Sequence, residues 1–201
     1  MILRSLLGDR SEGFYIDIGA HHPIYYSNTY HFYLKEWSGL NIDALPGSME
    51  LFRKLRPRDI NIEACISNQD GDNVTFFQFS KPAINSFDPN YAEELINKGE
   101  VLVGKSQLRT KTLKAILSEN NLSSKKIDFM TIDIEGVDSI VLKSLDFNLI
   151  RPRIIVFEDH RYNLMKPEDS ELLRFLIENK YQLVAKTGPS LIAKDVLDNT
   201  Q

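Results

Sequence analysis

Phe14-Tyr-Ile-Asp-Ile-Gly-Ala-His-His-Pro23 is the stretch of the sequence that decides the fold. Residues 13–19 form an apolar run that contains Asp17 and ends on Gly19, which predicts a buried strand followed by a tight turn. An acidic residue and a glycine at the carboxyl end of a first strand lie where open α/β sheets bind ligands, at the topological switch point. The stretch therefore predicts an α/β protein with a ligand site directly after its first strand.

The rest of the chain alternates short apolar runs with amphipathic stretches, as expected for strands that are connected through helices into a parallel sheet. Strands are predicted at 40–43, 60–66, 127–134 and 153–158, and helices at 28–37, 48–55, 113–119, 137–145 and 169–179. The last two apolar runs, 181–185 and 190–194, are too close together for a helix between them, so they should pair antiparallel. We expect a mostly parallel sheet with helices on both faces and an antiparallel final strand.

An insertion interrupts this pattern at about residues 70–110. Asp70-Gly71 is a strong turn signal, and residues 74–79 are rich in strand formers, which indicates an antiparallel hairpin. Residues 81–108 contain prolines and glycines around one amphipathic piece, 91–97, and are expected to form a loop with a short helix. The sequence contains no repeat or linker, so we expect residues 1–201 to form one domain.

The composition is that of a globular protein with a sizeable core, because 42% of the 201 residues are hydrophobic and 26% are charged. The net charge of −4 argues against a nucleic-acid partner, and the basic residues of 53–58 are expected to form a solvated helix end. No apolar run approaches the roughly 20 residues that span a bilayer, and residues 1–7 are too short for a signal peptide. Cys65 is the only cysteine, which excludes an internal disulfide and makes the cytoplasm the expected location.

The loop after the first strand is poor in glycine. A dinucleotide fingerprint has three glycines that let the backbone approach a pyrophosphate, whereas residues 19–23 read Gly-Ala-His-His-Pro. A ligand with an amino acid tail and no phosphate can use Asp17 as the partner of its ammonium group. Asp43 ends the second strand, where an acidic side chain can accept both hydroxyls of a ribose. S-adenosylmethionine is therefore the favoured cofactor; the structural alternative is that Asp17 caps a helix and Asp43 starts a turn.

Two later strand ends carry residues suited to proton transfer. Asp133 and Glu135 are two positions apart, so both side chains are expected to face the ligand crevice. The next strand ends in Glu158-Asp-His160, and the ordinary pKa of a histidine, about 6.5, suits a base. Methylation of an alcohol needs a group that takes the hydroxyl proton, and the candidates are His160, Asp133, Glu135 and His22. The structural alternative is that Asp133 holds a loop and Glu135 caps the next helix.

The carboxylates at these strand ends, together with His160, have the oxygen-rich chemistry that hard cations prefer. No spacing in the sequence supports a metal site, however, and we expect an organic site without metal.

These motifs, taken together, resemble the FkbM family of S-adenosylmethionine-dependent methyltransferases. The resemblance rests on residues 14–23 and on Ser27-Asn-Thr-Tyr30, Asn41-Ile-Asp-Ala44, Pro46-Gly-Ser48 and Thr131-Ile-Asp-Ile-Glu-Gly136, in this order. It implies a Rossmann-like, seven-stranded class I methyltransferase fold. It also implies transfer of a methyl group, in many members to a hydroxyl of a sugar or of a polyketide-type molecule.

The resemblance also assigns cofactor-binding positions. The first motif of the family falls on Asp17, Gly19 and Ala20, with His21 next in the same loop, and the ribose acid falls on Asp43. The later motif falls on Asp133, Glu135 and Gly136, while Ala64 and Cys65 occupy the place where such folds contact the adenine. The sequence departs from the family pattern where His21-His22-Pro23 replaces the usual second glycine of the loop.

The expected function is O-methylation of a saccharide or of a small natural product. One alternative is a noncatalytic module that keeps the fold and binds the cofactor. A nicotinamide-dependent oxidoreductase is a weaker alternative, because the glycine-poor loop and the antiparallel final strand both argue against it.

Overall fold

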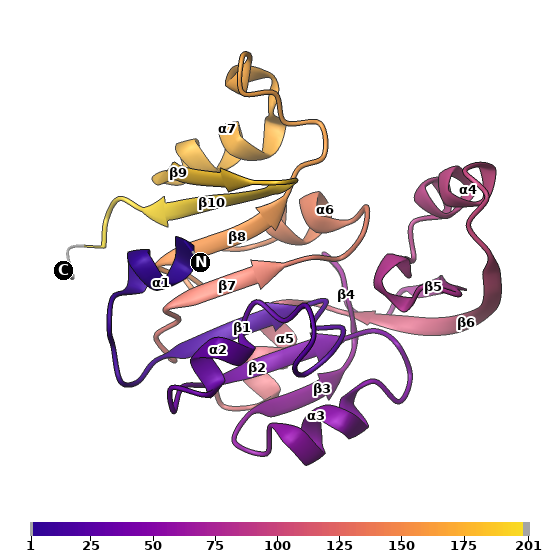
Figure 1. Cartoon of the computed structure of the whole chain (residues 1–201), viewed down its shortest axis with the longest axis horizontal. Helices are drawn as coiled ribbons and strands as arrows, with labels where there is room; N and C mark the ends of the chain where they lie inside the picture. The colour runs from indigo at the N-terminus through magenta and orange to yellow at the C-terminus, as the bar shows by residue number, and fades with distance from the viewer. Residues whose placement is uncertain (1, 199–201) are drawn as a thin grey trace.

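A computed structural model describes residues 2–198 of the chain (Figure 1). The strands are β1 (Phe14–Ile18), β2 (Ser38–Asp43), β3 (Ile60–Glu63), β4 (Cys65–Ile66), β5 (Asn73–Phe79), β6 (Leu102–Lys111), β7 (Phe129–Ile132), β8 (Ile154–Glu158), β9 (Tyr181–Thr187) and β10 (Ser190–Asp195). The α-helices are α1 (Ile2–Leu7), α2 (Tyr30–Tyr33), α3 (Met49–Leu55), α4 (Pro89–Asn97), α5 (Leu113–Glu119), α6 (Asp138–Lys143) and α7 (Glu171–Glu178), and two 3₁₀ turns cover Pro82–Ile84 and Pro167–Asp169.

The main sheet has seven strands in the order β3-β2-β1-β7-β8-β10-β9. Strands β3, β2, β1, β7 and β8 pair in parallel, whereas β10 is antiparallel to both of its neighbours, β8 and β9. The turn between β9 and β10 contains Gly188 at a φ of +56°, a conformation that glycine adopts without a steric penalty. The expected fold, a mostly parallel seven-stranded sheet with an antiparallel final strand, is confirmed.

Helices cover both faces of this sheet, as expected, because successive side chains of each strand point in opposite directions (Figure 1). On one face Ile16 belongs to the main core, to which α5 contributes Ile116 and α6 and α7 contribute further apolar residues. On the other face Tyr15 packs in a second core with Leu3 of α1 and Phe32 of α2. Alternate residues of β1 therefore face different helical layers: Ile16 faces the layer of α5, α6 and α7, and Tyr15 faces the layer of α1 and α2.

The segment between β4 and α5 differs from the expectation in two places. The strand predicted at 60–66 is split, because β3 stays in the main sheet while β4 leaves it to pair with β6. Residues 102–111, most of which were expected in a loop, form the long strand β6, which pairs antiparallel with β5. Gly104 and Ser106 share the inward positions of β6 with two leucines, Leu102 and Leu108, so the sequence lacks the continuous apolar alternation of an ordinary strand.

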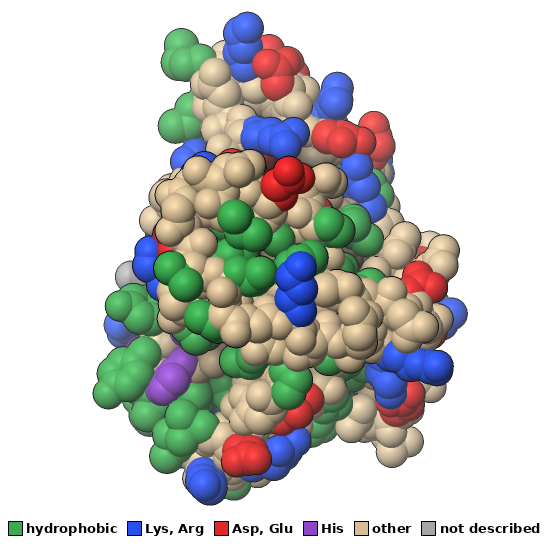
Figure 2. Space-filling model, turned by 90° about the vertical axis from the view of Figure 1, so that its right-hand side faces the viewer, with side chains coloured by type: hydrophobic (Ala, Val, Ile, Leu, Met, Phe, Trp, Pro, Cys, Tyr) green, Lys and Arg blue, Asp and Glu red, His purple; other side chains and the backbone are tan. Residues whose placement is uncertain are grey.

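Strands β5 and β6 and helix α4 form an arm that projects from the main sheet (Figure 1). Figure 2 shows the side of the molecule that the arm occupies, where hydrophobic side chains gather over the middle and charged side chains of both signs mix toward the top. The predicted helix at 91–97 is present as α4, and Asp88 caps its N-terminus by accepting the N–H of Asn90. The arm is therefore a folded unit that borders the site described below.

The helix predicted at 28–37 is shorter than expected and covers only Tyr30–Tyr33. Glu36 adopts a φ of +66°, which ends the helical path before Trp37 enters the core. Within residues 2–198, no helix has both the length and the apolar character to cross a membrane.

Candidate active site

The residues predicted to bind the cofactor come together where β1, β2, β7 and β8 end. These four strands are neighbours in the sheet, so residues far apart in sequence share one edge. Asp17 and Asp43 lie at the ends of β1 and β2, and Asp133 and Glu158 lie at the ends of β7 and β8. The residues predicted for the site therefore share the sheet edge at which the strand order reverses between β1 and β7.

Gly19 turns the chain sharply after β1. Its φ is +82°, and a Cβ atom built on it would lie 1.8 Å from the backbone oxygen of Asp133. The N–H groups of Gly19 and Ala20 both donate to the carbonyl oxygen of Ile42, at 2.9 and 3.0 Å. The loop is thus held between β2 and β7 and needs a residue without a side chain at this point.

Asp43 organises the same loop from the end of β2. Its Oδ2 accepts the N–H of His21 and its Oδ1 accepts the N–H of Leu45, both at 2.8 Å. Burial raises the pKa of the Asp43 carboxyl, and these two N–H donors oppose that rise. A carboxylate offers about four acceptor positions, so two remain for the hydroxyls of a ribose. The turn-forming role that we considered as an alternative is present and leaves room for the binding role.

Asp17 points to the face of the sheet that α2 covers. Only 4% of the residue is exposed, and one carboxylate oxygen accepts the hydroxyl of Thr29 at 2.6 Å. Burial raises the pKa of Asp17 to about 6, while the Thr29 hydroxyl and the Arg56 charge oppose the rise. Asp17 therefore ties β1 to the loop that leads into α2.

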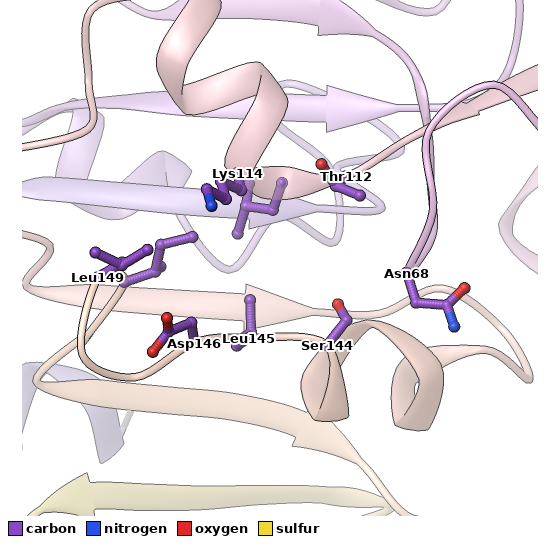
Figure 3. A pocket seen from close by; sticks show the side chains of 9 residues that line it. Asn68, Thr112, Lys114, Ser144, Leu145, Asp146 and Leu149 are labelled. Carbon is purple, nitrogen blue, oxygen red and sulfur yellow. The ribbon is translucent and has the colours of Figure 1, made fainter.

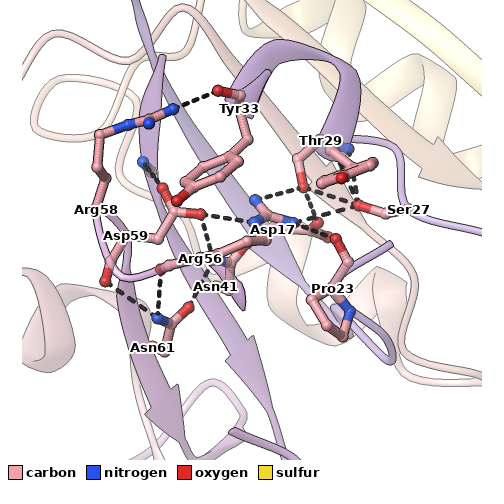
Figure 4. A network of polar contacts seen from close by, with 12 residues as sticks. Asp17, Pro23, Ser27, Thr29, Tyr33, Asn41, Arg56, Arg58, Asp59 and Asn61 are labelled. Carbon is pink, nitrogen blue, oxygen red and sulfur yellow. Dashed lines mark hydrogen bonds and ion pairs between the residues drawn. The ribbon is translucent and has the colours of Figure 1, made fainter. Parts of the chain in front are cut away.

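A buried polar network supports this loop from below (Figure 4). The Arg56 side chain is completely buried and donates to Asp59 at 2.8 Å, to the Tyr15 hydroxyl at 2.7 Å and to Thr29 at 3.0 Å. Thr29 in turn donates to Asp17, so the network links the buried ion pair to the end of β1. The expectation of a solvated helix end for the basic residues of 53–58 is wrong for Arg56. Its position three residues before Asp59 was the available signal for an ion pair.

Four carboxylates lie near the ends of β7 and β8, namely those of Asp133, Glu135, Asp138 and Glu158. Burial, and after it the negative charge of Glu158, raises the pKa of Asp133 to about 8 and contributes to a pKa of about 7 for Asp138. The same two causes raise the pKa of Glu135, against the hydrogen bond that Tyr91 donates. Asp133 is also exposed to solvent, so water screens part of the shift in its pKa until a ligand displaces that water. This edge of the sheet is strongly electronegative.

Glu135 connects the main sheet to the arm. Its Oε2 accepts the Tyr91 hydroxyl of α4, and its backbone oxygen accepts the Ser86 hydroxyl at 2.6 Å. Gly136, at a φ of +93°, lets the loop pass close to Tyr91, since a Cβ atom there would lie 3.1 Å from the Cβ of Tyr91. Sequence reasoning did not anticipate the Tyr91–Glu135 contact, because the two residues are 44 positions apart.

The histidines proposed as bases have different surroundings. His22 accepts the N–H groups of Ile24 and Tyr25 on Nδ1, at 3.1 and 3.0 Å, so its neutral form carries the proton on Nε2. Burial, and after it the neighbouring His21, lowers the pKa of His22. His160 places Nε2 3.1 Å from Glu158 Oε2, with 62% of its side chain exposed. The carboxylate can orient the imidazole and stabilise its protonated form.

A crevice of about 720 Å³ opens beside Glu158 and His160, between α4 on one side and α6 and α7 on the other. Its volume lies within the range of about 300–1,000 Å³ that is usual for small-molecule sites. It is lined by Tyr91, Glu94, Leu95, Lys98, Gly136, Asp138, Ser139, Glu158, Asp159, His160, Arg161, Asp169, Glu171 and Leu172. The crevice thus joins the arm to the ends of β7 and β8.

A second hollow, of about 190 Å³, lies between the start of α5 and the segment that follows α6 (Figure 3). Lys114 and Asp146 are its charged lining residues, and it contains none of the residues predicted for the site. Within residues 2–198, no group of three or more His, Cys, Asp or Glu side chains is arranged to hold a metal ion.

The predicted adenine contacts lie at the edge of the arm. The N–H of Ala64 donates to the backbone oxygen of Asp43 at 3.0 Å, which places Ala64 beside the predicted ribose acid. Cys65 is buried in a cluster with Phe76 and Phe87, and burial raises the pKa of its thiol to about 12. Cys65 therefore belongs to the apolar cluster behind the predicted adenine position, and the partly buried Ala64 is the residue of the pair that is open to a ligand.

Comparison with known proteins identifies one family. The family model described as "Methyltransferase FkbM domain" matches residues 17–183, which include every residue predicted for the site. No curated protein matches the sequence significantly. Among solved structures, the precorrin-6y C5,15-methyltransferase from Geobacter metallireducens GS-15 superposes with a TM-score of 0.43 at 12% identity, over 96% of this chain and 85% of that chain.

Proposed function

The chain belongs to the FkbM methyltransferase family, and we propose that it transfers the methyl group of S-adenosylmethionine to a hydroxyl of a saccharide or a small natural product. The observation that carries the proposal is the arrangement along one sheet edge: the Gly19 turn and Asp43 lie at the ends of β1 and β2, and the Glu158–His160 pair lies in a crevice at the end of β8, with β7 between them. Residues suited to the cofactor and a residue suited to be the base thus share one edge of the sheet, as methyl transfer requires.

The residues at the ends of β1 and β2 fit the cofactor. Because Gly19 packs closely against β7, the turn of the loop carries no side chain. Asp43 keeps two acceptor positions for the ribose hydroxyls. Ala64 borders the adenine side. Asp17 is buried behind the loop and accepts the Thr29 hydroxyl, whereas the exposed Asp133 at the end of β7 is the acid open to the ammonium group of the amino acid tail, whose charge would favour its ionised form. When bound, S-adenosylmethionine supplies an electrophilic methyl group on a sulfonium centre.

The Glu158–His160 pair is the best-placed acceptor of the hydroxyl proton. With Nε2 of His160 3.1 Å from Glu158 Oε2, Nδ1 is left to take the proton of the acceptor hydroxyl, and the Glu158 carboxylate stabilises the imidazolium that forms. His22 would have to give up two backbone hydrogen bonds to do the same with Nδ1. Glu135 is engaged by Tyr91, and Asp133 lies against the Gly19 turn, outside the lining of the crevice that contains His160.

Isothermal titration with S-adenosylhomocysteine tests the cofactor assignment. We expect saturable binding by the wild-type protein and a loss of roughly tenfold or more in affinity for Asp43→Ala, because the ribose hydroxyls lose their acceptor. Glu119→Gln, an exposed carboxylate on α5, is the matched control and should bind like the wild type. Absence of binding by the wild type at high micromolar ligand would overturn the proposal.

Transfer of a labelled methyl group to a panel of saccharides tests the reaction. A nicotinamide-dependent enzyme would instead be stabilised against heat by a nicotinamide cofactor and not by S-adenosylhomocysteine. Binding of S-adenosylhomocysteine by a protein with wild-type Glu158 and His160, but without transfer to any hydroxyl, would favour the noncatalytic module.

A further inference from the structure

The crevice beside His160 has an unbalanced set of charges. Six of its fourteen lining residues are acidic, namely Glu94, Asp138, Glu158, Asp159, Asp169 and Glu171, whereas only Lys98 and Arg161 are basic. The outer acids have basic partners: Glu94 pairs with Lys98 and Glu171 pairs with Lys143, each at 2.6 Å. The charge at the rim is therefore largely neutralised.

The inner acids lack such partners. Within residues 2–198, Asp138, Glu158, Asp159 and Asp169 form no ion pair with a lysine or an arginine, and the ion-pair partner of Glu158 is the histidine His160. Glu158 accordingly raises the pKa of Asp133, Glu135 and Asp138 around it. Asp138, Glu158 and Asp159 are buried or half-buried and form an electronegative floor of the crevice, whereas Asp169 is exposed.

Asp138 shows most directly that a group is missing from this floor. The residue is 7% exposed, and its Oδ1 is buried without a hydrogen-bond partner among the described residues. Its Oδ2 accepts only a long bond, 3.4 Å, from the N–H of Ile134. A buried carboxylate oxygen without a donor costs about 1–3 kcal/mol. A donor that enters the crevice, and above all a cationic one, would recover that cost.

The cofactor does not account for this charge. Asp133 is the acid that borders the Gly19 loop, so a sulfonium or ammonium held at that loop lies on the β1 side of the cluster. Asp138, Glu158 and Asp169 line the crevice itself, next to α6 and α7. The unneutralised charge is therefore on the side that the methyl acceptor enters.

We infer that this crevice selects an acceptor that carries an amino group close to the hydroxyl to be methylated, such as an amino sugar, and rejects acceptors that carry a carboxylate or a phosphate. The inference rests on the proposed function, because it assigns the crevice to the methyl acceptor. The ammonium group lies against Asp138 and Glu158, and the hydroxyl lies against His160. A volume of about 720 Å³ accommodates a sugar unit with further substituents.

Three hexoses that differ in one substituent test the charge preference. Saturation-transfer NMR on the protein saturated with S-adenosylhomocysteine measures the affinities of glucosamine, glucose and glucuronate. We expect glucosamine to bind about tenfold more tightly than glucose at low salt, glucuronate to bind more weakly than glucose, and the differences to shrink at 0.5 M salt. Equal binding of the three sugars, tighter binding of glucuronate, or no binding of glucosamine at 50 mM would overturn the inference.

A pair of matched variants locates the effect. Asp138→Asn combined with Asp169→Asn removes two acidic side chains from the crevice and should reduce the preference for glucosamine at least threefold. Asp146→Asn makes the same chemical change in the second hollow and should leave the preference unchanged. The proposed function is tested separately by titration of S-adenosylhomocysteine without sugar, and the NMR measurement is repeated without S-adenosylhomocysteine. Failure of the titration, with a glucosamine preference still present in the protein alone, would reject the function, whereas binding of S-adenosylhomocysteine without a glucosamine preference would reject only the inference.

Discussion

Replacement of Asp59 by asparagine would leave the buried Arg56 charge without its acidic partner. Both side chains have no exposed surface, and Arg56 Nε lies 2.8 Å from Asp59 Oδ2. The Asp59 carboxylate also accepts the Tyr15 hydroxyl, the Gly39 N–H at 2.8 Å and the Asn41 amide at 2.9 Å, so both of its oxygens face donors. An asparagine has one oxygen and one NH₂ group, and in either orientation the NH₂ group points at a donor.

The expected loss follows from this geometry. Removal of one partner of a buried ion pair costs about 3–5 kcal/mol, because an uncompensated charge remains in the interior. A domain of this kind has a free energy of unfolding of about 5–15 kcal/mol, so the substitution removes a substantial part of it. Since Arg56 also holds Thr29, and Thr29 holds Asp17, the folded variant should bind S-adenosylhomocysteine more weakly as well.

Urea unfolding followed by circular dichroism measures the effect. Asp59→Asn should lower the unfolding midpoint without a change in the slope. Glu119→Gln, which breaks the exposed Lys111–Glu119 pair, is the control and should cost less than about 1 kcal/mol. Adding Arg56→Met to Asp59→Asn should recover stability, because the second substitution removes the unpaired charge. A loss below about 1 kcal/mol for Asp59→Asn, or a further loss on adding Arg56→Met, would refute the reasoning.

Three further outcomes follow from the site. Gly19→Ala should destabilise the protein by more than about 2 kcal/mol and abolish S-adenosylhomocysteine binding, because the new methyl group meets the backbone of Asp133. Urea unfolding measures the loss of stability and titration measures the loss of binding, and near-wild-type values in both would contradict this prediction. The pKa of Asp138 is about 7 in the folded protein, above its unfolded value, so the folded state binds more protons and stability should fall as the pH rises from about 4 to about 7. Asp138→Asn should make the unfolding midpoint depend less on pH over this range, and an unchanged pH dependence would contradict the prediction. His160→Gln should lower kcat by about 10²–10⁴-fold with unchanged S-adenosylhomocysteine affinity, whereas an equal loss of affinity would show that His160 serves binding.

The local sequence predicted the main elements well because short-range patterns determine them. Residues 14–18 form β1 and 113–119 form α5 where apolar periodicity indicated a strand and a helix. The short link at Gly188-Pro189 predicted the antiparallel pair β9–β10, since no crossover helix fits between those strands. The positions of Gly19 and Asp43 at two successive strand ends also followed from the sequence, because parallel strands end at one edge of the sheet.

Contacts between distant segments were decided by the tertiary structure alone. The burial of Arg56 depends on Tyr15, Thr29 and Asp59 meeting on one face of the sheet, and no local pattern distinguishes it from the exposed basic residues around it. Strand β6 exists because β5 and β4 offer it hydrogen-bonding partners, which compensates for its polar inward side chains. The loop prediction failed there for that reason.

The sequence by itself determined the family resemblance, the parallel sheet and the edge at which the residues predicted to bind the cofactor gather, because strand ends and turn residues are encoded within a few positions of one another. The tertiary structure decided which of the candidate acids and histidines border the crevice. It paired His160 with Glu158, tied His22 to its own loop and engaged Glu135 with Tyr91 of the arm. Pairings of this kind depend on distances across the fold, which sequence spacing does not contain.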